Sequence, residues 1–441
     1  MTAAPFPALV SVVTTDFAAV TRGRPVPEDR LDHTAQAGIG WVPANISLTP
    51  FNVIADPNPW GSCGDLRIVP DVAARYRTTR TGSATPLDLV MGDIVELDGT
   101  PWNACSRTFL KHALADLTAR TGLSVTAAFE QEFQLAGDGR PPAHAFSVEA
   151  LRRADPFAPQ LAACLAEAGV EPEMVLAEYG ADQFEVTHAP TDALRAADRA
   201  IAIREITREV ARNLARPATF SPKPSLEGVG NGVHIHFSFT TADGAPATYA
   251  ADRPGGLSDI AGAFCAGILR HLPALTAFTA SSVASYYRLV PHSWSSSYTW
   301  LAERDREAAL RICPTVSIGG RDPARQYNIE FRAADASANP YLALGVLVRA
   351  GLSGIAAGLT TPPLVTGDPS RMTETERAEK GLRRLPESLS AALAAFEADT
   401  TVAGWFDPIV RESFVGMKRA EMAMLEGLDR AAICERYRAV Y

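Results

Sequence analysis

Two carboxylates at alternate positions in the segment VTAAFEQEFQL are the first residues whose types and spacing suggest chemistry. In a β-strand, successive side chains point to opposite faces, so Glu130 and Glu132 would share one face while Phe129 and Phe133 share the other. Adjacent carboxylates repel each other unless positive charge lies nearby, and a hard cation such as Mg²⁺ prefers oxygen ligands of this kind. The alternative is a pair of solvated glutamates on an exposed sheet face, which this motif alone does not exclude.

A second pair of carboxylates occurs in the segment EYGADQFEVTH. Glu178 and Glu185 are seven positions apart, which would place them on opposite faces of one straight strand. Gly180 and Asp182 indicate a turn or bulge between them, and such a turn would let both side chains reach one site. The alternative is again a pair of surface carboxylates.

The segment GNGVHIHFSF places two histidines and a serine on one strand face. His234, His236 and Ser238 alternate with apolar residues, so a polar face lies opposite a wholly apolar one. Histidines at this spacing are as typical of a ligand or phosphate site as of a structural role. The preceding glycines permit close approach of a ligand, but they precede a strand, and the chain contains no GxxxxGK[ST] motif. Neither a dinucleotide fingerprint nor a P-loop is therefore predicted.

Glu330 and Arg332 share a strand face in the segment YNIEFRAAD. An arginine fork beside a carboxylate suits an anionic substrate. The stretch before this segment is rich in arginine, either as exposed loop residues or as a phosphate clamp: Arg288, Arg304, Arg306 and Arg311. Together, the glutamates, the histidine and the arginines predict two divalent cations that hold the phosphates of a nucleotide, with phosphoryl transfer as the reaction.

The pattern of the chain indicates which elements must position these residues. The first part is rich in short strand-type runs (VSVVTT, DLRIVPD, DLVMGDIVELDG) separated by a long Pro/Asn-rich loop. Ser106 is predicted to cap the next helix and Gly122 to end it, after which strands and helices alternate. Helices are also predicted over 342–359 and over the final segment KRAEMAMLEGLDRAAICERYRAV. We predict an α+β fold with two domains, residues 1–106 and 107–441.

The composition excludes several classes of protein. The 441 residues include 47% hydrophobic and 21% charged residues, which is typical of a globular rather than a disordered chain. The net charge of −9 and the absence of a Lys/Arg-rich run argue against binding to nucleic acid or to an anionic membrane. The six cysteines form no CxxC pair, no basic residue precedes Arg22, and Arg349 interrupts the apolar segment 342–359. We therefore expect a cytoplasmic protein with reduced thiols and without a signal peptide or a membrane span.

These segments resemble the glutamine synthetase family. The motifs that carry the resemblance are EQE, EYGADQFE, GNGVHIHFS, RLVP, RICP and IEFRAADASANPYL, and their order matches the family over nearly the whole chain. The resemblance implies a small N-terminal β-grasp domain and a large catalytic domain whose curved antiparallel sheet forms a funnel. It also implies a homo-oligomeric ring, commonly a dodecamer, with each site completed by a neighbouring subunit. The implied reaction uses ATP to phosphorylate the γ-carboxylate of glutamate, after which an amine displaces phosphate.

The resemblance also implies a role for each matching residue. Two or three Mg²⁺ or Mn²⁺ ions per site would be held by six residues: Glu132, Glu178 and Glu185 at one ion, and Glu130, His234 and Glu330 at another. Glutamate would be bound by Gly230, His234, Arg288 and Arg332. ATP would be bound by His236, Ser238, Arg306 and Arg311. The catalytic residues would be Arg288, Arg332 and Arg306.

Two departures from the family pattern concern the amine. The stretch SLTPFNVIADPNPW lacks the Asp-Gly-Ser-Ser-like loop that binds ammonium in glutamine synthetases, and Trp294 stands where the family has a flap glutamate, six residues after Arg288. An indole cannot act as a base, but it can contact an alkyl or aryl amine by apolar or cation–π interaction. We therefore predict a ligase that forms a γ-glutamylamide from glutamate and an organic amine, with Trp294 in the amine pocket.

Three alternatives remain open on the sequence. The first is a glutamine synthetase that uses ammonia, with Asp56 or a residue of a neighbouring subunit in place of the lost base. The second is a non-catalytic, ring-forming homologue that binds ATP. The third is a ligase for an acid other than glutamate, because Val229 replaces the asparagine that opens the family's glycine-rich motif.

Overall fold

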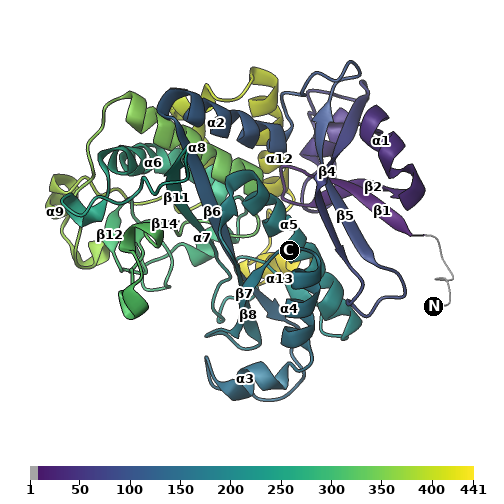
Figure 1. The fold of residues 1–441 in the computed structure, drawn as a ribbon, viewed down its shortest axis with the longest axis horizontal. Helices are drawn as coiled ribbons and strands as arrows, with labels where there is room; N and C mark the ends of the chain where they lie inside the picture. Colours follow the sequence, from purple (N-terminus) through teal and green to yellow (C-terminus); the bar gives the residue numbers. More distant parts are fainter. Residues whose placement is uncertain (1–7) are drawn as a thin grey trace.

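The computed structural model describes residues 8–441 and begins with a five-stranded sheet in the order β2-β1-β5-β4-β3. Strands β1 and β5 are parallel at its centre, and the other pairs are antiparallel. This sheet and helix α1 occupy one end of the molecule (Figure 1). Their bounds are β1 Leu9–Thr15, β2 Thr21–Pro27, α1 Leu31–Ala37, β3 Ile39–Trp41, β4 Leu66–Thr78 and β5 Leu87–Val95.

A nine-stranded sheet forms the framework of the rest of the chain. Its main path runs in the order β12-β13-β14-β11-β6-β8-β7, and two short strands, β9 and β10, pair with β6. The bounds are β6 Leu123–Leu135, β7 Pro172–Ala177, β8 Gln183–His188, β9 Thr191–Asp192, β10 Ala218–Thr219, β11 Val233–Thr241, β12 Leu301–Glu303, β13 Leu310–Ile312 and β14 Ile329–Phe331. The predicted α+β class is confirmed. The sheet is antiparallel as predicted except at its edge, where β12 and β13 are parallel.

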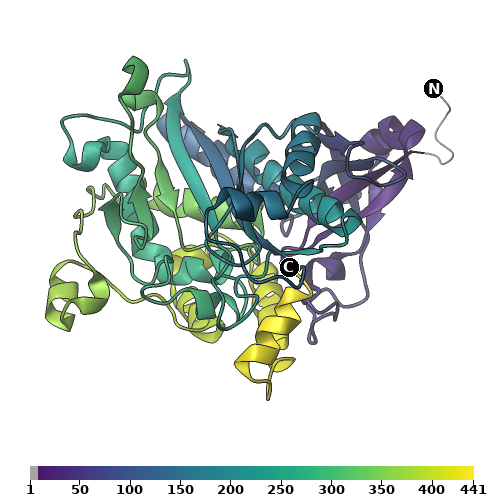
Figure 2. The same cartoon turned by 90° about the horizontal axis from the view of Figure 1, so that it is seen from below.

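Helices pack against the apolar faces of this sheet and against each other. The long helices are α2 Ser106–Thr121, α5 Ala193–Asn213, α6 Asp259–Thr279, α8 Pro340–Ala356 and α12 Pro408–Ala423. The shorter ones are α3 Val148–Arg153, α4 Phe157–Glu167, α7 Ser285–Arg288, α9 Glu374–Glu379, α10 Leu389–Ala398, α11 Thr400–Ala403 and α13 Arg430–Arg438. The C-terminal helices, drawn in yellow, project from the lower side of the molecule in Figure 2, and Phe414 of α12 packs edge-on against Phe17 of the N-terminal part.

The apolar face predicted for β11 is buried against α6. Phe237 and Phe239 each lie close to Phe264, with ring centroids 5.4 and 4.9 Å apart. Helix α6 in turn packs closely on α8, because a Cβ atom on Gly267 or Gly354 would overlap the backbone of the other helix. These contacts fix which face of β11 remains open to ligands.

Helix α6 is, within residues 8–441, the one helix long and apolar enough to cross a membrane. Its most apolar stretch is 72% buried inside the protein, as expected of a core helix. The helix predicted over 342–359 is confirmed as α8, which is also largely buried. The final segment predicted as helical is instead divided between α12 and α13, and Gly427 in the break has a φ of +79°.

The sequence predicted that Ser106 caps α2, but the residue at the cap position is Cys105. Ser106 is the first residue of the helix, and its hydroxyl donates to the backbone oxygen of Thr15 (3.0 Å), which ties α2 to β1. Gly122 ends the helix in the left-handed conformation, as expected. The division of the chain at 106/107 stays a prediction.

A buried arginine at the start of α2 connects the N-terminal sheet to helix α5. Arg107 donates two hydrogen bonds of 2.9 Å to Asp198 of α5, one of 3.1 Å to Asp93 of β5 and one of 2.8 Å to Asp71 of β4. Tyr341 of α8 donates to the same carboxylate of Asp198. Removing the guanidinium would leave Asp198 buried without a positive partner.

Arg107→Met should therefore lower the free energy of unfolding by about 3–5 kcal/mol. Thermal or urea unfolding of the purified protein measures this change. The matched control is Arg195→Met, which removes an exposed arginine of α5 that pairs with exposed Asp192 at 3.6 Å, and which we expect to cost about 0–1 kcal/mol. Equal destabilisation by the two substitutions would contradict the linking role of Arg107.

Candidate functional site

Strand register brings the predicted carboxylates and histidines to one face of the larger sheet. His234 of β11 lies opposite Glu130 of β6, and His236 lies opposite Glu330 of β14. The Nδ1 atom of His234 is 3.1 Å from Glu130 Oε2 and 3.6 Å from Glu330 Oε1. His236 Nε2 is 3.1 Å from Glu130 Oε1. Alternation along the strands, together with this register, thus produces one cluster from three strands.

The second pair of glutamates joins the cluster through the predicted turn. Strand β7 ends just before Glu178, and the chain turns back into β8 through Asp182, whose φ is +53°. Glu185 on β8 then lies directly opposite Glu132 on β6. The turn explains how two residues seven positions apart approach the same carboxylates.

Repulsion among these carboxylates is strong on the β6–β8 side of the cluster. Burial, followed by the negative charges of Glu130, Glu132 and Glu178, raises the pKa of Glu185 to about 9. Burial and the charge of Glu132 also raise the pKa of Glu178. Without a cation, this side of the site binds a proton.

The carboxylates on the opposite side of the cluster are held ionised by neighbouring arginine and histidine side chains. Burial favours the neutral acid at Glu330, but His234 and Arg332 more than offset it and lower its pKa to about 2. Burial likewise opposes ionisation of Glu130, whose pKa is nevertheless held well below its ordinary value by hydrogen bonds from His234 and His236. The site therefore has one proton-binding half and one half held ionised.

Two sets of ligand atoms in this cluster fit a divalent cation. The atoms of each set lie within 4.8 Å of one another: Glu130, His236 and Glu330 in one, and Glu130, Glu185 and His234 in the other. Carboxylate oxygens with an imidazole nitrogen suit Mg²⁺ or Mn²⁺, and the raised pKa of Glu185 indicates that positive charge is lacking on the β6–β8 side of the cluster.

The grouping differs in part from the one the resemblance implied. His236, expected at the nucleotide, belongs to one of the two sets. Glu132 accepts a 2.6 Å hydrogen bond from the backbone of Gly232, and Glu178 accepts one from Tyr179 N–H at 3.1 Å. The assignment of each ligand to a particular ion stays a prediction.

Glu330 anchors two of the predicted arginines. Its side chain is fully buried, and it accepts hydrogen bonds from Arg311 (2.6 Å) on β13 and from Arg332. Arg332 also donates to the backbone oxygens of Arg306 (2.8 Å) and Trp294 (3.1 Å). A single buried carboxylate therefore connects the cation cluster to the loop that carries Trp294.

Arg288 lies beneath the predicted glycine-rich loop. Its guanidinium is buried and donates to the backbone oxygens of Ala334 (3.1 Å) and Arg332 (3.4 Å). A Cβ atom on Gly232 would come within 2.4 Å of the guanidinium, and one on Gly230 within 2.8 Å of the Arg288 side chain. Glycine at both positions is what lets the loop pack on Arg288.

The loop with Trp294 is held by an acid that the sequence analysis did not single out. Both carboxylate oxygens of Glu307 accept backbone hydrogen bonds, from His292 N–H (3.1 Å) and Trp294 N–H (3.0 Å). Trp294 has a φ of +52° and its side chain is 70% exposed. The backbone is therefore fixed beside Arg332 while the indole faces solvent.

Four further residues differ in their distance from the cluster. Asn328 and Cys313 were not predicted, whereas Ser238 and Arg306 were. Asn328 Oδ1 accepts a hydrogen bond from His236 Nδ1–H (2.9 Å), and Cys313 Sγ lies 3.7 Å from the same nitrogen and 3.8 Å from Glu330. Both could have been found by alternation, since Asn328 lies two residues before Glu330 and Cys313 two after Arg311. Ser238 lies farther along β11, opposite Thr126. Arg306 is exposed, and its charge lowers the pKa of Glu178 after the larger effects of burial and Glu132.

The raised pKa of Glu185 predicts how the metal-free protein responds to pH. A carboxyl group with a folded-state pKa of about 9 and an unfolded value of 4.5 binds its proton more tightly in the folded state. Its contribution to stability is therefore complete below the unfolded value and is lost as the pH rises toward 9.

We expect the Tm in EDTA to fall between about pH 6 and about pH 9, and Mg²⁺ to oppose this fall because the ion replaces the proton. Thermal unfolding across this pH range, with and without Mg²⁺, measures both effects. Glu185→Gln removes the titrating group and should flatten the dependence in EDTA. The same slope in wild type and Glu185→Gln would contradict the assignment.

Comparisons with known proteins agree with this arrangement. The model of the glutamine synthetase N-terminal domain matches residues 5–102, and that of the glutamine synthetase catalytic domain matches residues 103–437. The gamma-glutamylpolyamine synthetase GlnA3 of Streptomyces coelicolor is 34% identical over 97% of this chain and 92% of its own. A crystal structure of a novel glutamine synthase homologue is 44% identical, covers 100% of both chains and has a TM-score of 0.92. The GmaS–ADP complex is 26% identical over 96% of this chain and 95% of its own, with a TM-score of 0.81. The chain therefore belongs to the glutamine synthetase family.

Proposed function

We propose that this protein is an ATP-dependent ligase that joins the γ-carboxylate of glutamate to an organic amine through a γ-glutamyl phosphate. The observation that carries the proposal is the pairing of a complete acid, histidine and arginine cluster with a tryptophan on the adjoining loop. The cluster suits activation of a carboxylate by ATP, and Trp294 replaces the acidic residue expected for ammonia. The name of the Streptomyces relative, a gamma-glutamylpolyamine synthetase, supports an amine as the second substrate.

The residues of the cluster would have different roles in phosphoryl transfer. Bound divalent cations would screen the phosphate oxygens so that a second anion can approach. Arg311 and Arg306 would contact the nucleotide phosphates, together with His236 and Ser238 at the nucleotide. Arg332 and Arg288 would hold the substrate carboxylate and the transferring group, a role for which planar donors are suited.

Gly230 would contribute to the same substrate subsite. Its backbone lies over Arg288, because the missing side chain leaves room for close approach. A glutamate bound there would place its γ-carboxylate toward the cation cluster. His234, which contacts both Glu130 and Glu330, would complete this wall.

The amine subsite is proposed at the solvent-facing indole of Trp294. A flat aromatic surface attracts an ammonium group or an alkyl chain without the strong preference for the small NH₄⁺ ion that a carboxylate provides. Glu307 accepts a hydrogen bond from the Trp294 N–H, and Arg332 donates one to the Trp294 backbone oxygen, so both sides of this residue are hydrogen-bonded.

We further propose a homo-oligomeric ring, most simply a dodecamer, of a cytoplasmic protein with two or three Mg²⁺ or Mn²⁺ ions per site. Sites between subunits suit the loop around Asp56, because the neighbouring Val53 and Ile54 are about half exposed (48% and 47%). Apolar side chains at such exposure on one loop favour contact with another protein surface.

An amine panel tests the substrate assignment. Protein with Mg²⁺, ATP and glutamate should release phosphate faster with an alkylamine, a polyamine, ethanolamine or an aromatic amine than with ammonia. Faster release with ammonia than with every organic amine would establish a glutamine synthetase instead. Nucleotide binding without phosphate release for any amine would establish a non-catalytic homologue, and replacing glutamate by other acids tests the acid.

Trp294→Glu should shift the preference toward ammonia. A carboxylate attracts NH₄⁺, and loss of the indole removes a contact worth about 0.5–2 kcal/mol, so the ratio of kcat/KM for the preferred amine to that for ammonia should fall by about twofold to thirtyfold. Trp294→Phe retains an aromatic ring and is the matched control that should keep the amine preference. An unchanged ratio in Trp294→Glu would place the amine elsewhere.

A further inference from the structure

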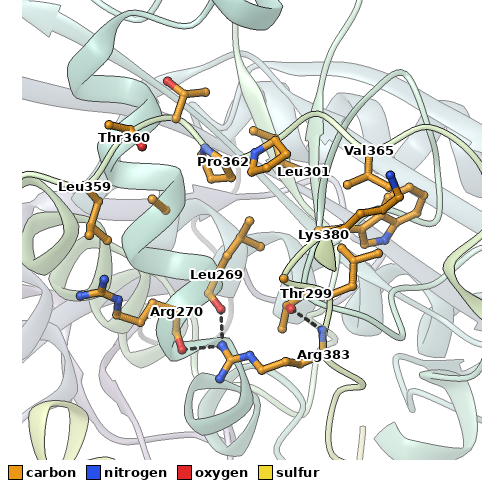
Figure 3. A pocket seen from close by; sticks show the side chains of 16 residues that line it. Leu269, Arg270, Thr299, Leu301, Leu359, Thr360, Pro362, Val365, Lys380 and Arg383 are labelled. Carbon is orange, nitrogen blue, oxygen red and sulfur yellow. Dashed lines mark hydrogen bonds between the residues drawn. The ribbon is translucent and has the colours of Figure 1, made fainter. Parts of the chain in front are cut away.

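A cavity of about 320 Å³ lies between α6, β12 and the segments 359–365 and 380–383 (Figure 3). Its walls are formed by residues 266–270 of α6, 299–301, 359–365 and 380–383. None of the cluster residues described above lines it. This volume lies at the small end of the range for ligand pockets.

The charged residues that line this cavity are all basic. Arg270, Lys380 and Arg383 line it, and no acidic residue is among its lining residues within the described part of the chain. Asp399, whose charge acts on Arg383, is itself engaged by His271 at 2.6 Å. Two other cavities of about 300 and 350 Å³ are lined by both basic and acidic residues. Only the first of the three therefore favours an anion by its lining.

The inner surface of the cavity is largely apolar. Leu269, Leu301 and Val365 lie around it in Figure 3, and Trp300 lines it with its side chain almost fully buried. Apolar walls with a few cationic groups at the rim match a small molecule that has one acidic group and an apolar body.

Hydrogen bonds connect the cavity walls to the Trp294 loop. Arg383 and Thr299 exchange two hydrogen bonds (2.9 and 3.0 Å), and the Arg383 guanidinium donates to the backbone oxygens of Leu269 and Arg270. Trp300 Nε1–H donates to the backbone oxygen of Glu307 at 3.0 Å. Glu307 in turn holds the backbone N–H groups of His292 and Trp294. The wall of the cavity is thus two hydrogen-bonded steps from the proposed amine subsite.

We propose that this cavity binds a small amphipathic anion, a carboxylate, sulfonate or phosphate on an apolar body, and that binding stabilises the Trp294 loop. The acidic group lies at the cationic rim, and the apolar part lies against Leu269, Trp300 and Val365. By holding Trp300, the ligand strengthens the contact to Glu307 and orders the amides of residues 292 and 294. The amine affinity of the proposed reaction then depends on an effector that never touches the reacting groups.

Calorimetric titration of the full-length protein with naphthalene-2-sulfonate tests the binding site. The double variant Arg270→Gln/Lys380→Gln should weaken binding by about fivefold or more, because charge-assisted contacts to the sulfonate are lost. The control double variant Arg152→Gln/Arg419→Gln removes the same charge from two exposed arginines elsewhere and should leave the affinity unchanged. Uncharged 2-naphthalenemethanol should bind more weakly than the sulfonate to wild type.

A second test of the binding site is Ala266→Phe. The larger side chain fills the cavity and should abolish binding of both naphthalene-2-sulfonate and 2-naphthalenemethanol. Equal affinity of the sulfonate for wild type and Arg270→Gln/Lys380→Gln would overturn the site, and those two exposed substitutions are not expected to impair folding. These titrations need no turnover, so their outcome is independent of the proposed ligase reaction.

Hydrogen exchange tests the connection to the loop. Saturating naphthalene-2-sulfonate should slow exchange of the His292 and Trp294 amides in wild type. It should not do so in Trp300→Phe, which keeps the apolar wall but lacks the N–H donor to Glu307. Unchanged exchange in wild type, or equal slowing in Trp300→Phe, would overturn the coupling, and an effector-dependent KM for the amine is the corresponding kinetic result.

Discussion

Mutual repulsion of carboxylates on neighbouring strands is the constraint on which the rest of this site depends. The register of β6 against β8 and β11 places Glu130, Glu132 and Glu185 close together, and the side chains cannot separate because the opposite faces of the strands are buried. The repulsion must be relieved by cations or protons. Apolar packing thus holds the strands in place, and the carboxylates on the open face of the sheet require positive charge nearby.

Side chains of the protein supply positive charge only on the side of the cluster that contains Glu130 and Glu330. Arg311 and Arg332 pair with Glu330. His236, whose pKa is raised above its ordinary value by Cys313 and Glu130 despite its burial, pairs with Glu130. On the β8 side, burial and neighbouring carboxylates leave Glu185 with a raised pKa. This asymmetry suits a site in which protein cations position the substrates' anionic groups while metal ions complete the charge balance.

Glu330 also connects the charged cluster to the loop proposed to bind the second substrate. Glu330 fixes Arg332, and Arg332 holds the backbone of Trp294, whose neighbouring contacts are supplied by Glu307. The loop proposed to face the amine is therefore linked to the charged cluster by hydrogen bonds. If the proposed amine subsite is correct, exchange of one residue on this loop would change the amine without disturbing the groups that activate the acid.

Alternation along strands was sufficient to find Glu130, Glu132, His234, His236, Glu330 and Arg332, because the period of two is a local property of an extended chain. The ordered motifs also identified the family, and Gly180 with Asp182 indicated the turn that unites Glu178 with Glu185. Pairing partners, in contrast, are set by contacts distant in sequence. Only the tertiary structure therefore decided that His236 shares a ligand set with Glu330, that β12 and β13 run parallel, and that Ser106 bonds to Thr15 instead of capping α2. The role of Glu307 could not be predicted for the same reason, because it depends on contacts between loop residues, which follow no periodic pattern.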